Sequence, residues 1–73
     1  MREDQPRYEV IIYWSVEDAA FIAEVPELPG CAADGATYQD ALANVEVSMR
    51  EWIETAREEG RPIPEPKGRM TFA

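Results

Sequence analysis

The chain has 73 residues, with 15 acidic side chains against 7 basic ones and a net charge of −8 at pH 7. A chain of this length makes one small domain that buries only about 60–65% of its unfolded surface, so we expect homo-oligomerisation to add stability. The single cysteine and the lack of histidine exclude an internal disulfide, His- or Cys-based zinc sites, and Ser–His or Cys–His catalysis. The acidic balance disfavours nucleic-acid binding by this chain alone and suits a basic protein partner.

The amino terminus has none of the features of a targeting segment. Residues 1–6 are polar and end in a proline, which predicts a flexible tail and no signal peptide. No run approaches the roughly 20 apolar residues that a membrane span needs. We therefore expect a cytoplasmic protein with no membrane partner.

Two segments of alternating residues predict the first two strands. Residues 7–14 are largely β-branched or aromatic, which favours a strand. Residues 15–19 are polar enough for a hairpin loop, and residues 20–25 supply the second strand. A hairpin of this kind pairs the two strands antiparallel.

Proline and glycine residues separate the second strand from a third. Pro26 cannot donate to a strand ladder and therefore ends the second strand. Pro29 has a fixed φ and Gly30 accepts a positive φ, which together predict a type II turn. A short third strand is expected over residues 31–34, antiparallel to the second, and Gly35 breaks it.

A long helix follows the third strand. Thr37 is a good N-cap, and Asp40 gives a weaker form of the capping box. Gly60 suits the position just past the helix end, with Pro62 beyond it. The helix is expected to have about 22 residues and a length of roughly 33 Å. Its apolar stripe, at helical spacing, consists of Tyr38, Ala41, Leu42, Val45, Met49, Trp52, Ile53 and Ala56.

The carboxyl-terminal part completes the predicted topology. Residues 61–68 contain three prolines and predict an extended connector, and residues 69–72 predict a short last strand. The expected class is α+β with the order β-β-β-α-β, in which one long helix packs on a small mixed sheet. A right-handed crossover places the last strand beside the first, which gives the spatial order 4-1-2-3. Residues 1–73 are interpreted as a single domain.

Alternation along the strands divides their residues between two faces. The face that matches the helix stripe carries Tyr8, Val10, Ile12, Trp14, Phe21, Ala23 and Val25. The opposite face carries Ile11, Tyr13 and Ile22 beside Glu9 and Glu24. An uncovered apolar cluster usually marks an interface, although single exposed apolar residues are common. We expect this face to contact a partner, with Ile11 and Tyr13 holding a homodimer or larger assembly.

One group of motifs carries a family resemblance. Its positions are residues 24–31 (EVPELPGC), Gly35, Thr37, residues 40–42 (DAL), Asn44 and, upstream, residues 8–10 (YEV). In this pattern the chain resembles HicB-like antitoxins over roughly residues 8–66. The resemblance implies a β-β-β-α-β fold of the partial RNase H-like kind, in agreement with the topology predicted from the strand and helix patterns.

The resemblance also implies a toxin–antitoxin role without enzymatic activity or cofactor. The implied partner is a small basic toxin of the HicA type, which cleaves RNA and is inhibited when its RNA-binding face is covered. Family members typically append a DNA-binding module, whereas only a few residues follow Gly68 here, so we expect no operator binding by this chain alone. The candidate protein-interface residues are Glu9, Ile11, Tyr13, Ile22, Glu24, Glu27 and Asp34.

Two other functions stay open at this point. One is an orphan oligomeric interaction domain without a toxin partner. The other is a metal-dependent nuclease, because Glu9 and Glu24 on adjacent strands could hold one hard cation, although a two-metal site would need about four carboxylates. Cys31 is expected to be a small buried residue rather than a nucleophile, and Trp52 is expected to belong to the core.

Overall fold

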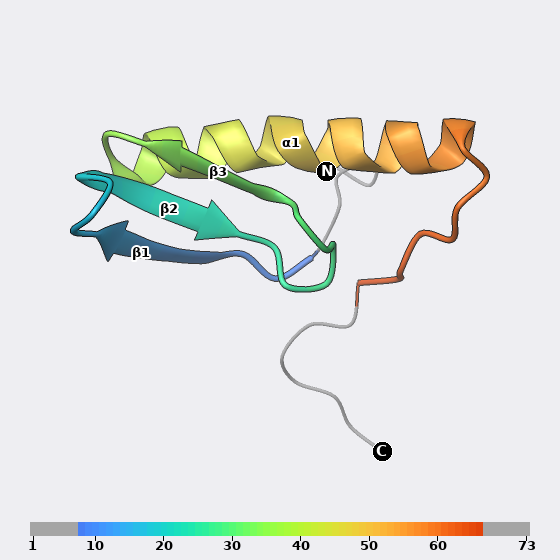
Figure 1. The fold of residues 1–73 in the computed structure, drawn as a ribbon, viewed down its shortest axis with the longest axis horizontal. Helices are drawn as coiled ribbons and strands as arrows, with labels where there is room; N and C mark the ends of the chain where they lie inside the picture. Colours follow the sequence, from blue (N-terminus) through green and yellow to red (C-terminus); the bar gives the residue numbers. More distant parts are fainter. Residues whose placement is uncertain (1–7, 67–73) are drawn as a thin grey trace, which may run out of the picture.

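The structure, a computed structural model, describes residues 8–66 and has three strands followed by one helix (Figure 1). The elements are β1 (Ile11–Ser15), β2 (Ala20–Glu24), β3 (Ala32–Gly35) and α1 (Tyr38–Glu58). The strands form an antiparallel sheet in the order β1-β2-β3, and α1 covers one of its faces. The predicted α+β class and the β-β-β-α order are confirmed. The last strand predicted over residues 69–72, and with it the parallel pairing of a mixed sheet, lies outside the described residues.

The strands are shorter than predicted at the end of the sheet where β2 meets its loop. β1 begins at Ile11 rather than at residue 7, and β2 ends at Glu24, one residue early. In the observed register Ile11 pairs with Glu24, so the residues before Ile11 would face Val25 and Pro26. The chain turns away from the ladder there, and proline has no N–H to donate. The third strand is shifted by one residue to Ala32–Gly35, because Cys31 closes the preceding turn.

Gly35 allows the chain to pass closely from β3 into α1. A Cβ at this position would lie 2.4 Å from the backbone nitrogen of Ala41 and 2.7 Å from the Cβ of Asp40. Only a residue without a side chain fits this approach. The hydroxyl of Thr37 then accepts the backbone N–H of Asp40 at 3.0 Å, which confirms the predicted N-cap.

The end of α1 is also the predicted one. Gly60 has a φ of +70°, and its N–H donates to the carbonyl of Arg57 at 3.2 Å. The N–H of Arg61 donates to the carbonyl of Ala56 at 2.8 Å. These two bonds form a Schellman motif, which satisfies carbonyls left open by the last helical turn. The helix has 21 residues, close to the expected length.

The core lies between α1 and the β2–β3 side of the sheet, and it is built from small side chains. The buried apolar residues are Tyr8, Ala23, Val25, Leu28, Cys31, Ala41, Val45, Met49 and Ala56. Leu28 and Val45 are the largest of the side chains that are completely buried. The helix packs mainly over β3, less over β2 and least over β1. The expectation that Trp14 lies under the helix, and that Tyr38 and Leu42 belong to the buried stripe of α1, is therefore wrong: all three are exposed, and α1 packs least over β1.

Three side-chain hydrogen bonds hold the connecting segments against this core. The indole N–H of Trp52 donates to the carbonyl of Pro29 at 2.9 Å, which ties the β2–β3 loop to the middle of α1. The amide of Asn44 donates to the carbonyl of Asp34 at 2.7 Å, on the strand that α1 covers most. The hydroxyl of Tyr8 donates to the carbonyl of Pro64, which brings the proline-rich segment back to the start of the described chain.

Candidate functional site

The sheet face opposite α1, here called the open face, brings together five of the candidate interface residues. The register places Ile11 beside Glu24 and Tyr13 beside Ile22 across β1 and β2. On the other side of β2, Asp34 pairs with Ile22. Ile11 is 40% exposed and Tyr13 42% exposed, which is high for large apolar side chains. The open face is therefore an apolar strip crossed by two carboxylates.

Tyr13 and Glu24 are joined across the open face. The hydroxyl of Tyr13 donates to Oε2 of Glu24 at 2.8 Å. This hydrogen bond, followed by burial and by the negative charges of Glu24 and Asp18, raises the pKa of Tyr13 above its ordinary value of 10.0. The hydrogen bond restricts the position of the Glu24 carboxylate. An oriented carboxylate is better prepared to accept a cationic partner than a freely rotating one.

The two remaining candidates lie beyond the ladder. Glu9 precedes β1 and Glu27 lies in the β2–β3 loop, and both residues are half-buried. Burial raises the pKa of Tyr8, and the negative charges of Glu27 and Glu65 raise it further. Both candidates belong to the loop end of the sheet rather than to the apolar strip. Their part in an interface stays a prediction.

The β2–β3 loop, residues 25–31, consists of two consecutive tight turns. The N–H of Leu28 donates to the carbonyl of Val25 at 3.1 Å, and the N–H of Cys31 donates to the carbonyl of Leu28 at 2.9 Å. Gly30 has a φ of +81°, which confirms the predicted type II turn. The N–H of Val25 donates to the carbonyl of Cys31 at 3.0 Å and closes the loop. The proline and glycine residues of the signature segment therefore serve turn geometry.

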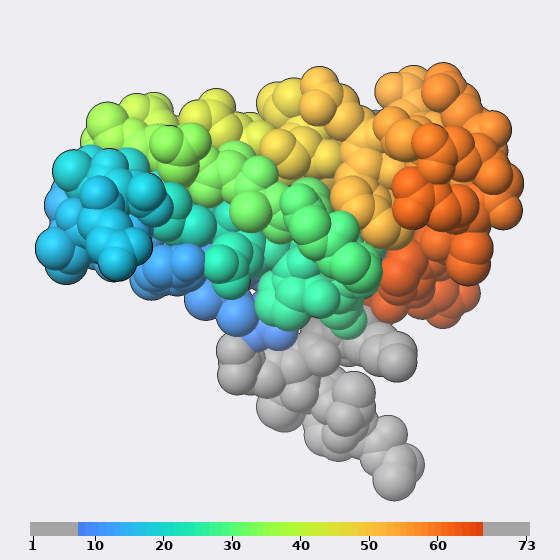
Figure 2. Space-filling model, viewed as in Figure 1, coloured from blue at the N-terminus to red at the C-terminus, as the bar shows by residue number. Residues whose placement is uncertain are grey.

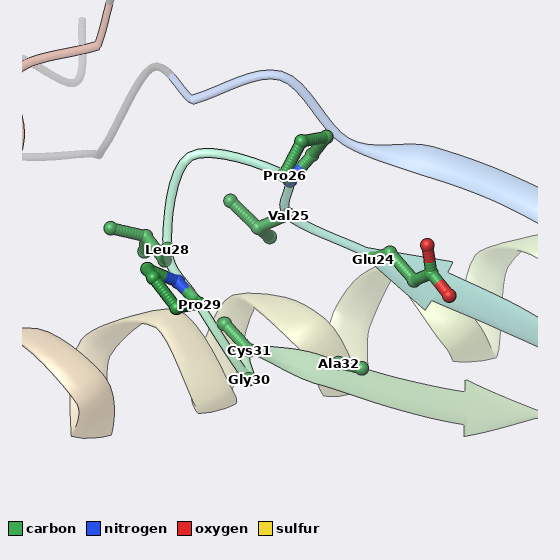
Figure 3. Close-up of a pocket in the computed structure, with 8 residues that line it drawn as sticks. All are labelled: Glu24, Val25, Pro26, Leu28, Pro29, Gly30, Cys31 and Ala32. Atoms are coloured by element: carbon green, nitrogen blue, oxygen red, sulfur yellow. The ribbon is translucent and has the colours of Figure 1, made fainter.

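An open pocket of about 270 Å³ lies along this loop (Figure 3). Its lining consists of Glu24, Val25, Pro26, Leu28, Pro29, Gly30, Cys31 and Ala32. Glu24 and Ala32 are cross-strand partners on the open face, so the pocket continues the apolar strip toward the loop. The predicted burial of Cys31 is confirmed, and burial raises the pKa of its thiol above 9.0. A buried, protonated thiol is a poor nucleophile.

Carboxylates are spread over the surface rather than gathered. Within residues 8–66, no three Asp, Glu, Cys or His side chains come together in a group that could hold a metal ion. The pair of Glu9 and Glu24 that would hold a single cation is not brought into one strand ladder, because Glu9 precedes β1. In the same part of the chain, no helix is long and apolar enough to cross a membrane.

Charge is divided unevenly along the chain. Residues 8–49 include eight acidic residues and no lysine, arginine or histidine. This segment forms the whole described sheet and the first half of α1. The basic residues of the described part, Arg50, Arg57 and Arg61, all lie on the later half of α1 or beyond it. The sheet and the start of the helix therefore present a negative potential without local compensation.

Sequence reasoning missed a second exposed apolar surface. Trp14, Phe21 and Tyr38 were assigned to the helix-covered face, but Trp14 is 50% exposed and Tyr38 55% exposed. The ring of Phe21 contacts both Trp14 and Tyr38 at the hairpin end of the sheet. Periodicity assigns a residue to a face, but it does not say how far along and across that face the helix extends. The uneven coverage by α1 is visible only in the fold.

Comparison with known proteins identifies relatives over most of the chain. Residues 8–70 match the family described as HicB_like antitoxin of bacterial toxin-antitoxin system. A UPF0150 protein of Thermoplasma acidophilum is 38% identical over 58 residues, which cover 80% of this chain and 83% of the relative. A UPF0150 protein of Synechocystis is 35% identical over 57 residues, which cover 78% of this chain and 77% of the relative. No solved structure matches.

Proposed function

This chain belongs to the HicB-like antitoxin family, and on that premise we propose that it binds and occludes a small basic toxin of the HicA type that cleaves RNA. The observation that carries the proposal is the open face, where exposed apolar residues alternate with carboxylates on a protein of net charge −8. Such a surface matches the RNA-binding face of a basic protein. Covering that face excludes the RNA substrate.

The open face has the composition of a binding surface for a cationic protein. Ile11, Tyr13 and Ile22 supply apolar area at its centre, which is where interfaces concentrate their binding energy. Glu24 and Asp34 flank this area and take the place of the phosphates that the toxin would otherwise bind. Complementary charge of this kind accelerates association and discriminates against other partners.

The pocket beside the open face supplies a further anchor point. Its walls are mainly apolar, and the carboxylate of Glu24 stands on the strand that leads into it (Figure 3). An apolar side chain of the toxin can enter between the β2–β3 loop and β3 while a neighbouring basic side chain reaches Glu24. The turns of this loop are hydrogen-bonded and tied to Trp52, so little ordering is needed on binding.

The proposed role is regulatory, as the antitoxin family suggests, and it operates by binding rather than by catalysis. We place it in the cytoplasm, where an RNA-cleaving toxin has to be restrained. The alternative of a metal-dependent nuclease receives no support from the spread of carboxylates within residues 8–66. Glu9 and Glu27 contribute to the proposed toxin contact only at its rim, because they lie beyond the strands.

Self-association through the same face is the competing use of the open face. Ile11 and Tyr13 would hold a homodimer, as expected for a domain with a core this small. A homodimer would bring Glu24 and Asp34 of two copies together, so salt should strengthen it by screening repulsion. A complex with a basic toxin has the opposite salt dependence. Sedimentation of the chain alone and with the toxin, each at low and high salt, therefore shows which of the two contacts uses the open face.

The test compares two charge reversals of equal size. The first is Glu24→Lys with Asp34→Lys on the open face, and the control is Glu51→Lys with Glu54→Lys on the exposed helix surface. With a basic, RNA-cleaving toxin of the HicA type as partner, the open-face pair should slow association by about tenfold or more and release RNA cleavage. The helix pair should inhibit nearly as well as the wild type. Equal effects of the two pairs, with both folds intact by circular dichroism, would contradict the assignment of the open face.

A further inference from the structure

Three aromatic side chains from three different elements form a row at the hairpin end of the molecule. Trp14 of β1 and Phe21 of β2 are cross-strand partners, with ring centroids 5.0 Å apart and an edge-on angle of 71°. Phe21 also packs against Tyr38, the first residue of α1, with centroids 4.4 Å apart and an interplanar angle of 32°. We call Trp14, Phe21 and Tyr38 the aromatic row. Its two outer rings are held in place by the central one.

The aromatic row is exposed although it lies on the helix side of the sheet. Trp14 is 50% exposed, Tyr38 is 55% exposed, and Leu42, one helical turn after Tyr38, is 39% exposed. The cause is the placement of α1 over β3, which leaves β1 almost uncovered. Figure 2 shows the hairpin end in cyan beside the yellow-green start of the helix at one extremity of the molecule. Rigid, half-exposed aromatic rings are the residue type most enriched at binding hot spots.

The charges around the aromatic row specify the chemistry of a partner. Glu17 and Asp18 lie in the β1–β2 turn, and Asp40 lies in the first turn of α1. Asp18 is held on the open-face side of this turn, because its carboxylate accepts the hydroxyl of Ser15 at 3.0 Å and its charge acts on Tyr13. The local carboxylates of the aromatic row are therefore Glu17 and Asp40. No basic residue occurs between residues 8 and 49 to offset them. Aromatic ring faces and nearby carboxylates both attract cations.

We propose that the aromatic row is a second contact surface, which binds an arginine side chain of a basic protein by stacking and cation–π attraction. The identity of that protein as an RNA-cleaving toxin rests on the proposed function, whereas the cation-binding property does not. A second copy of this chain is a poorer occupant, because it would bring a further Glu17 and Asp40 to the same place. The aromatic row faces away from the open face, so a partner that uses both must reach around the hairpin end.

The two tryptophans allow the proposal to be tested within one molecule. Trp14 belongs to the aromatic row, whereas the indole of Trp52 is bonded to the carbonyl of Pro29 on the loop. The probe is a capped peptide with three arginines separated by glycines, titrated into ¹⁵N-labelled protein, and a matching citrulline peptide serves as the uncharged control. We expect the indole N–H signal of Trp14 to shift with the arginine peptide and that of Trp52 to remain. Equal shifts of both indoles, or the same shift with citrulline, would overturn the proposal.

Substitutions at Tyr38 separate ring chemistry from general attraction by charge. Tyr38→Phe keeps an aromatic face and should bind the arginine peptide as the wild type does, whereas Tyr38→Leu should bind about two- to fivefold more weakly. Equal binding by the two variants would overturn the proposal, and so would a Trp14 signal that moves with protein concentration alone, which would indicate self-association. If the arginine peptide shifts the Trp14 signal but a HicA-type toxin does not bind, this inference is upheld and the proposed function is refuted. A toxin that binds without changing the Trp14 signal would support the proposed function and refute this inference.

Discussion

The two sides of the sheet use side chains of very different size. On the side covered by α1, Ala23, Ala33 and Gly35 let the helix approach closely. On the open face, Ile11 and Tyr13 remain exposed to solvent. Burial stabilises a protein roughly in proportion to the apolar area removed from water. The large residues of the open face therefore contribute little to folding, and their burial is realised only when another surface covers them.

The comparison predicts that Leu28 of the β2–β3 loop contributes more to the free energy of unfolding than any residue of the open face. Leu28 is completely buried, so Leu28→Ala should lower the free energy of unfolding by about 2–5 kcal/mol. Ile11→Ala removes a 40% exposed side chain and should cost much less. Urea denaturation followed by circular dichroism measures both. If Ile11→Ala were as destabilising as Leu28→Ala, the open face would be part of the core.

Substitution of two glycines tests how closely α1 approaches the covered side of the sheet. Gly35→Ala should cost about 1–3 kcal/mol, because its Cβ would meet backbone atoms of α1 that cannot move independently. Gly30→Ala is the matched control, with a φ of +81° but no atom within 4 Å of its Cβ. We expect the smaller loss at Gly30, from backbone strain alone. A larger loss at Gly30 would show that the helix does not press on the sheet at Gly35.

A smaller effect is expected at alkaline pH, from the buried thiol of Cys31 on the covered side. Burial raises the pKa of the Cys31 thiol in the folded protein above its ordinary 9.0. The folded state therefore keeps a proton that the unfolded chain releases, so this part of the stability is complete below about pH 9 and declines as the pH rises further. Cys31→Ala should flatten that decline, measured by urea denaturation at several pH values. An identical pH profile for the variant would assign the decline to Tyr8 and Tyr13, whose pKa values are also raised.

Local chemistry made most elements predictable from the sequence. Thr37 and Gly60 mark the helix ends, and Pro29 with Gly30 marks the turn, because each residue type satisfies a specific backbone requirement. Alternation also assigned Ile11 and Tyr13 to the open face. The lateral position of the helix was not predictable, since it follows from the small residues that face each other across the core. That position is what exposes Trp14 and Tyr38.

The most direct test of the central claim uses isoleucine methyl groups as probes of the two faces. Ile11 and Ile12 are adjacent in β1 but lie on opposite sides of the sheet. Ile22 of β2 lies on the open face with Ile11, whereas Ile53 of α1 packs against the core with Ile12. Methyl NMR spectra are recorded while a basic toxin of the HicA type is added. The account predicts large shifts for Ile11 and Ile22, with Ile12 and Ile53 nearly unchanged. Shifts confined to Ile12 and Ile53, or spread equally over all four of these isoleucines, would contradict it.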